Sequence, residues 1–334
     1  MLPTLLWTNH DAASVECQLC AHHCVLKAGR RGICGARINH EGRLTSVLTD
    51  LVSAVQMDPV EKKPLYHFLP GTKTFSIGSV GCNFRCRFCQ NAHISVIPAS
   101  GVVSGHRTTA KGLVDMALAK HAQSMAFTYN EPTLSVELIH ETCQRALAYQ
   151  LPVLLVSNGY MSAEFCTLLR NDIRAVNIDL KSFRDDFYRQ YCGARLAPVL
   201  DSLKRVRDLG WWLEVTTLVI PGLNDSHEEL ADCARFICEE LGRDVPWHLS
   251  AFHGAHEMQN HPSTPLATLQ EGWTIGKEMG LNYVYMGNVM TTLGGNTYCP
   301  HCSALVIERS PWKVTYPPKG RCPKCGTVIA GIWA

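Results

Sequence analysis

The chain has 334 residues, a length that suits one large domain with one or two small modules. Hydrophobic residues make up 46% of it and charged residues 18%, which is typical of a globular protein with a sizeable core. A net charge of +2 argues against nucleic acid or an anionic membrane surface as a partner. We find no signal-peptide pattern and no apolar run near the roughly 18 residues that cross a bilayer, so we expect a cytoplasmic protein.

Sixteen cysteines are unusual in a chain for which we expect no export. Because cytosolic thiols stay reduced, grouped cysteines here indicate metal ligands rather than disulfides. Five cysteines stand apart from any group, and we expect them to pack as small hydrophobic side chains. These are Cys143, Cys166, Cys192, Cys233 and Cys238.

The first cysteine group predicts a metal-binding module over residues 1–50. Its members are Cys17, Cys20, Cys24 and Cys34, with glycines and histidines among them. Four thiolates suit either zinc or an auxiliary iron–sulfur cluster, and the sequence does not choose between the two. A structural metal such as zinc is the narrowly preferred interpretation.

The next elements predict an α/β domain over residues 51–295. Short apolar runs are expected to form strands and amphipathic segments to form helices, with Thr133, Ser162 and Ser226 as helix N-caps. The expected strands are residues 74–80, 124–129, 152–157, 175–180, 211–220, 247–252 and 282–286, and the expected helices are 110–122, 134–150, 163–170 and 228–241. Repeated strand–helix units indicate a parallel sheet, either doubly wound or a barrel.

The second cysteine group follows the first of these strands. Cys82, Cys86 and Cys89 stand at C-x3-C-x2-C spacing, which suits three irons of a cubane cluster. No fourth cysteine lies nearby in the sequence, so one iron keeps an open position where a ligand binds. A triplet of buried or zinc-binding cysteines is the alternative interpretation.

Polar side chains follow several of the predicted strands. They are Asn130 and Glu131, Ser157 and Asn158, Asp179 and Lys181, and His253. Ligands of parallel α/β proteins bind at the carboxyl ends of strands, so we expect these side chains to form one pocket with the cysteine loop.

The last cysteine group predicts a small metal-binding module over residues 296–334. Cys299, Cys302, Cys322 and Cys325 form two C-x2-C knuckles, a pattern typical of zinc ribbons and rubredoxin-like sites. Zinc is the default ion and a single iron is the alternative, and we expect the metal to be structural.

These motifs together resemble the AmmeMemoRadiSam-system radical SAM proteins, relatives of pyruvate formate-lyase activating enzyme. The resemblance covers nearly the whole chain and is carried by residues 17–20, 32–35, 78–91, 127–132, 177–181 and 295–300. It implies a partial (β/α)6 TIM-type barrel, a [4Fe-4S] cluster on the second cysteine group, S-adenosylmethionine (SAM) as cosubstrate, and a low-potential electron donor.

The resemblance also implies roles for single residues. Glu131 would receive the methionine amine of SAM, in a segment where Tyr129 and Asn130 replace the two glycines of the family motif. The Asp179–Lys181 element and His253 would contact SAM, and Phe88 would lie near its adenine. Ser157 and Asn158 complete the expected cofactor-binding set.

The leading hypothesis is an enzyme that abstracts hydrogen from a protein substrate, as activating enzymes do. Radical modification of a small molecule or peptide side chain is the competing enzymatic hypothesis. A non-catalytic metal-binding protein whose knuckles bind partners is the third. Few aromatic residues stand among the basic residues of 299–334, so nucleic-acid binding is the least favoured.

Overall fold

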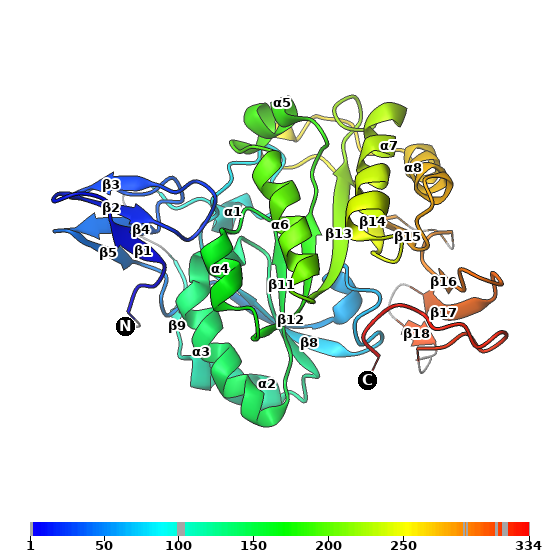
Figure 1. The fold of residues 1–334 in the computed structure, drawn as a ribbon, viewed down its shortest axis with the longest axis horizontal. Helices are drawn as coiled ribbons and strands as arrows, with labels where there is room; N and C mark the ends of the chain where they lie inside the picture. Colours follow the sequence, from blue (N-terminus) through cyan, green and yellow to red (C-terminus); the bar gives the residue numbers. More distant parts are fainter. Residues whose placement is uncertain are drawn as a thin grey trace. The chain divides into compact units, whose positions relative to one another are not determined.

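The computed structural model describes residues 3–98, 104–289, 291, 293–310, 313–315 and 320–333 (Figure 1). The chain forms two compact units. Unit 1 consists of Met1–Asp58 and Lys73–Ala175, and unit 2 of Pro59–Thr72 and Val176–Ala334. Each unit is described separately below.

An eight-stranded sheet has the order β15-β14-β13-β12-β11-β10-β8-β7, and β12 runs from unit 1 into unit 2. Its strands are β7 (Ala54–Pro59), β8 (Lys73–Gly78), β10 (Ser124–Phe127), β11 (Val153–Ser157), β12 (Ile173–Asp179), β13 (Trp212–Val219), β14 (Trp247–Ala251) and β15 (Val284–Gly287). The pairs β8–β10, β10–β11, β13–β14 and β14–β15 are parallel. Most residues of these paired strands are buried, as their continuous apolar sequences predict.

The order of the strands decides between the two architectures that the sequence left open. A doubly wound sheet reverses its strand order at a switch point, whereas each strand of a barrel lies beside its predecessor. From β8 to β15 the order follows the chain without reversal. No pairing between β7 and β15 closes the sheet among the described residues, so the fold is a partial barrel, as predicted.

The helices occupy the connections between these strands. They are α1 (Ala92–Ser95), α2 (Ala110–Ala119), α3 (Val136–Ala146), α4 (Ala163–Leu168), α5 (Asp185–Phe187), α6 (Ala197–Asp208), α7 (His227–Phe236) and α8 (Leu266–Glu278). A 3-10 turn (Leu147–Tyr149) extends α3, and π-helical turns follow α5 (Tyr188–Cys192) and α7 (Ile237–Leu241). In Figure 1, α2, α3 and α4 run beside the strands of unit 1, and α7 and α8 beside β14 and β15 of unit 2.

Two of the three predicted N-caps are confirmed. The Ser162 hydroxyl accepts a hydrogen bond from Phe165 N, and the Ser226 hydroxyl accepts one from Glu229 N. The prediction for Thr133 is wrong, because this residue lies inside a 3-10 turn (Pro132–Ser135). The Glu131 carboxylate caps that turn by accepting the Thr133 N–H, and α3 begins only after Ser135.

Short antiparallel strands carry the N-terminal cysteines in unit 1. The strands β1 (Trp7–Asn9), β2 (Ser14–Cys17) and β3 (Val25–Lys27) form one sheet, β4 (Arg37–His40) and β5 (Arg43–Ser46) form a hairpin, and β6 (Leu51–Val52) pairs with β9 (His106–Arg107). The Ser162 hydroxyl also donates to Gln18 O at 2.6 Å, which ties this module to the cap of α4.

Unit 2 ends in a three-stranded sheet of β16 (Thr297–Tyr298), β17 (Leu305–Ser310) and β18 (Lys313–Thr315). Cys299 and Cys322 of unit 2 are buried, and they pack with Tyr283 and Tyr285 in one apolar cluster. A 3-10 turn (Val60–Lys62) begins the other segment of unit 2, and another (His256–Met258) follows β14. Within the described ranges, every helix is too short or too polar to cross a membrane.

Candidate functional site

The loop that follows β8 carries the second cysteine group. Gly81 adopts a φ of +88°, and a Cβ atom there would lie 2.9 Å from the Ile97 side chain, so the turn before Cys82 needs glycine. The Cys82 sulfur accepts hydrogen bonds from Phe84 N at 3.4 Å and from Asn158 Nδ2 at 3.7 Å. The sulfur therefore lies among donors that stabilise a thiolate.

The residues of this loop fit an iron–sulfur cluster. The pKa of Cys82 is raised well above its ordinary value, mainly by burial and further by the nearby Glu131, Cys86 and Cys89. These groups therefore share one site. A bound metal would keep this sulfur ionised. In the C-terminal cysteine group all four sulfur atoms lie within 4.8 Å of one another, as the ligands of a single ion do. The sulfur atoms of Cys82, Cys86 and Cys89 do not form such a group. A cubane places its own iron under each sulfur and accounts for the wider spacing.

The segment after β10 holds the cysteine loop in place. Asn130 Oδ1 accepts the Ser79 N–H at 3.0 Å, and its Nδ2 donates to Ser79 Oγ at 3.0 Å and to Gly81 O at 2.7 Å. Tyr129, whose φ is +73°, donates from its hydroxyl to Asp58 at 2.6 Å. Asn130 thus fixes the start of the loop, and Tyr129 is tied to β7, structural roles that the sequence did not reveal.

Glu131 joins the ends of β10 and β11. Its carboxylate accepts hydrogen bonds from Thr133 N at 3.0 Å, Ser157 Oγ at 2.9 Å and Asn158 N at 2.9 Å, and from the Thr133 hydroxyl. Burial raises the pKa of this carboxyl, while the four donors oppose the rise. Three of the predicted residues, Glu131, Ser157 and Asn158, therefore meet directly.

Asn158 connects this strand end to the cysteine loop. Its Nδ2 donates to Asn83 Oδ1 at 2.7 Å in addition to its contact with Cys82. Asn83 is 1% exposed and was not singled out from the sequence, where only its place next to Cys82 marked it. Phe88, predicted near adenine, is buried in the same loop, and Phe84 packs edge-on against Tyr160 at 5.1 Å.

Unit 2 holds the remaining predicted cofactor residues. Lys181 Nζ forms an ion pair with Asp179 at 2.8 Å, where the side chains are 12% and 34% exposed. Asn224, in the loop after β13, donates to Lys181 O at 2.7 Å and thereby fixes the end of β12. His253 is exposed after β14, with its Nδ1 3.2 Å from Ser263 Oγ.

The C-terminal cysteines of unit 2 form a compact tetrad. Their four sulfur atoms all lie within 4.8 Å of one another. Among the described residues this is the group of metal-ligand side chains that comes together so closely. The sulfur pairs Cys299–Cys325 and Cys302–Cys322 are each 3.6 Å apart. A tetrahedral ion with metal–sulfur bonds of about 2.3 Å requires sulfurs about 3.8 Å apart, so the tetrad fits a single zinc or iron.

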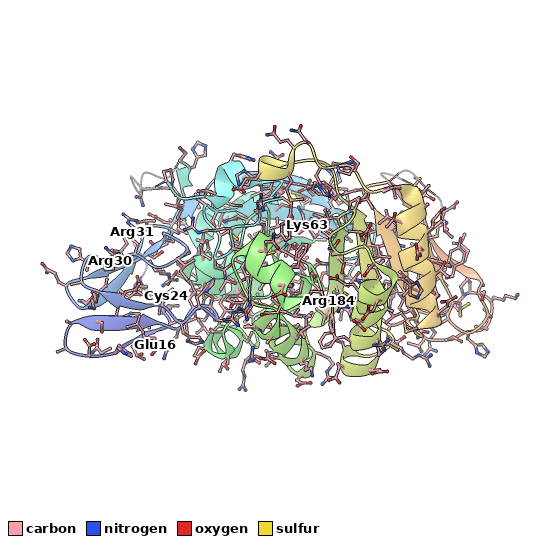
Figure 2. All side chains as sticks on the ribbon, turned by 90° about the horizontal axis from the view of Figure 1, so that it is seen from above. Glu16, Cys24, Arg30, Arg31, Lys63 and Arg184 are labelled. Carbon is pink, nitrogen blue, oxygen red and sulfur yellow. The ribbon has the colours of Figure 1, made fainter. Side chains whose placement is uncertain are left out.

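The N-terminal cysteines of unit 1 line a small enclosed cavity. Cys17, Cys20, Cys24 and Cys34 surround it, and Asn83 of the cysteine loop is also part of its wall. Figure 2 labels Cys24 on the blue N-terminal strands, together with Glu16, Arg30 and Arg31. Burial raises the pKa of Cys17 to about 11 and raises that of Cys20 further. A metal would have to displace these protons.

Comparison with known proteins defines the class to which the chain belongs. Residues 76–234 match the radical SAM superfamily model. The uncharacterized protein MJ0808 of Methanocaldococcus jannaschii is 39% identical over 309 residues, which cover 92% of each chain. The GTP 3′,8-cyclase of Paracoccus denitrificans is 25% identical over 169 residues, 49% of this chain and 48% of the cyclase. The protein belongs to the radical SAM superfamily.

Solved structures agree with this fold. SuiB of Streptococcus suis bound to S-adenosylmethionine superimposes with a TM-score of 0.51 at 13% identity, over 69% of this chain and 53% of SuiB. A domain of pyruvate-formate lyase-activating enzyme from Bacteroides vulgatus gives a TM-score of 0.45 at 17% identity, over 50% of this chain and all of that domain. The present chain spans about half the length of SuiB, and the likeness concerns the fold alone.

Proposed function

We propose that the protein cleaves SAM reductively and abstracts hydrogen from a protein substrate, in the manner of an activating enzyme. Superfamily membership implies a [4Fe-4S] cluster and radical cleavage of SAM, and the substrate class is our proposal. The observation that carries the proposal is the loop of Cys82, Cys86 and Cys89, fixed by polar contacts at the ends of two neighbouring parallel strands. When bound, the cluster supplies one electron to SAM and so generates the 5′-deoxyadenosyl radical.

The chain's own residues position and protect this site. Asn130 holds the beginning of the loop, and Asn158 donates to the Cys82 sulfur. Hydrogen bonds to sulfur favour the reduced, more negatively charged state of a cluster and raise its potential. Phe84 and Phe88 are almost fully buried and form the apolar part of the loop.

One feature supports a polypeptide as substrate. The loop after β14, which includes His253, is largely exposed and forms an open surface hollow lined by His256, Met258 and His261. A small-molecule substrate would favour a more enclosed pocket.

The first experiment tests the chemistry. Protein purified and reconstituted anaerobically with iron and sulfide is mixed with dithionite and SAM, and 5′-deoxyadenosine is measured. We expect product from the wild type and none from Cys82→Ala, Cys86→Ala or Cys89→Ala, each with a circular dichroism spectrum like that of the wild type. The matched control is Cys238→Ala, a partly exposed cysteine on a π-helical turn of unit 2, which should keep full activity. Product formation by any of the three loop variants would contradict the assignment.

The second experiment tests the substrate class. Cells that make the protein are grown in heavy water, and their extract is separated into macromolecules and a small-molecule filtrate. The reconstituted enzyme receives each fraction, and deuterium in 5′-deoxyadenosine is measured by mass spectrometry. We expect transfer from the macromolecular fraction, abolished by prior protease treatment. Transfer from the filtrate alone would refute the protein substrate and leave the SAM cleavage intact.

A further inference from the structure

We propose that Cys17, Cys20, Cys24 and Cys34 hold a second iron–sulfur cluster, ligated by all four cysteines, and not a zinc ion. The sequence narrowly favoured a structural metal here. Three observations on unit 1 reverse that preference: the spacing of the sulfurs, the polar groups that face the cavity, and the direct link to the Cys82 loop.

The spacing of the sulfurs separates the two kinds of metal site. The C-terminal tetrad has all its sulfurs within 4.8 Å, as one tetrahedral ion requires. The four N-terminal cysteines are all described, and their sulfurs do not meet that distance. They nevertheless line one and the same small cavity. A cluster, whose several irons separate its cysteine ligands, suits this arrangement better than one ion does.

Two unpaired donors face the same cavity. Arg37 Nε and Asn83 Nδ2 are buried and have no hydrogen-bond partner of normal geometry, and both residues line the cavity wall. Arg37 is fully buried, and its other nitrogens bind Glu137 Oε1 at 2.9 Å and Leu5 O at 3.1 Å. A buried donor without a partner destabilises the folded chain. The bridging sulfides of a cluster are acceptors for such donors, in addition to the cysteine sulfurs that either metal would bind.

The cavity adjoins the loop of the first cluster. His22, between Cys20 and Cys24, has its Nε2 2.9 Å from Asn83 O. Asn83 follows Cys82 directly, and its Oδ1 accepts from Asn158. Both metal sites therefore share Asn83. With four cysteines the second cluster has no open iron, so SAM should change the spectrum of the first cluster only.

The test uses the full chain with Cys82, Cys86 and Cys89 all replaced by alanine, which leaves the N-terminal cysteines intact. After anaerobic reconstitution we expect acid-labile sulfide, with about four irons for a cubane or about two for a two-iron cluster. The C-terminal tetrad contributes no labile sulfide, because a single ion contains none. Absence of labile sulfide from this variant, with zinc bound instead, would overturn the proposal.

A second variant and a second measurement secure the result. Adding Cys20→Ala and Cys24→Ala to the triple variant should remove the labile sulfide. If those changes unfold the module, the reduced triple variant still provides a test by electron paramagnetic resonance. We expect a cluster signal that added SAM does not alter, and a signal that SAM alters would contradict four-cysteine ligation. Either failure would leave the proposed SAM cleavage intact, since the triple variant lacks that site.

Discussion

Asn130→Ala is the most direct perturbation of the cysteine loop that spares its ligands. The change removes three hydrogen bonds, from Ser79 N and to Ser79 Oγ and Gly81 O. Each contributes about 1 kcal/mol, so the loop should lose about 3 kcal/mol of local stability. Because 1.4 kcal/mol corresponds to a factor of ten, the population of opened loop should rise about 100-fold.

The assay is the anaerobic release of iron to a chelator, together with formation of 5′-deoxyadenosine. We expect Asn130→Ala to lose iron about 100-fold faster than the wild type through the same local opening. The matched control is Gln123→Ala, an exposed amide that accepts from Lys73 N at the other end of β8 and should change little. Iron release from Asn130→Ala at the wild-type rate would refute the role we give to this side chain.

Three further predictions concern stability and metal content. Glu131→Gln leaves one buried backbone N–H, of Thr133 or of Asn158, without its acceptor in either amide orientation. We therefore expect a loss of about 2 kcal/mol in urea denaturation, and an unchanged midpoint would contradict these two contacts. Burial lowers the pKa of His67 to about 4, whereas the same side chain in the unfolded chain has a pKa of about 6.5. The free energy of unfolding should therefore fall by as much as about 3 kcal/mol as the pH drops from 6.5 to about 4, because the unfolded chain binds the proton first. His67→Gln should abolish this pH dependence, and its persistence would assign the effect to another group. Cys299→Ser with Cys322→Ser should remove one metal ion per chain and lower the melting temperature, whereas loss of the brown colour would show that the metals are wrongly assigned.

Much of the fold was predictable because its signals are local. The continuous apolar run at residues 74–80 became β8, and the serines before α4 and α7 cap those helices as expected. Thr133 failed because Glu131, held by the neighbouring strand, takes the capping position. Strand order is a relation between distant segments, so only the structure separated a partial barrel from a doubly wound sheet.

The candidate site shows the same division. The spacing of Cys82, Cys86 and Cys89 indicated the cluster because all three ligands lie in one loop. The contacts that support the loop, from Asn130 and Asn158, join residues about 50 to 76 positions apart, and no short pattern records such pairs. Asp179, Lys181 and His253 remain predicted SAM contacts that rest on family resemblance.

The sequence predicted three groups of cysteine ligands and indicated that one of them is the radical SAM motif. It left the metals of the two terminal groups open, because zinc and iron–sulfur clusters both accept four thiolates. The choice depends on how far apart the folded chain holds the sulfurs and on which buried donors face them. Cys299 to Cys325 converge as one ion requires, whereas Cys17 to Cys34 surround a cavity with the unpaired donors of Arg37 and Asn83. Only the tertiary structure bears on this choice, because it alone sets distances between residues that local spacing does not fix.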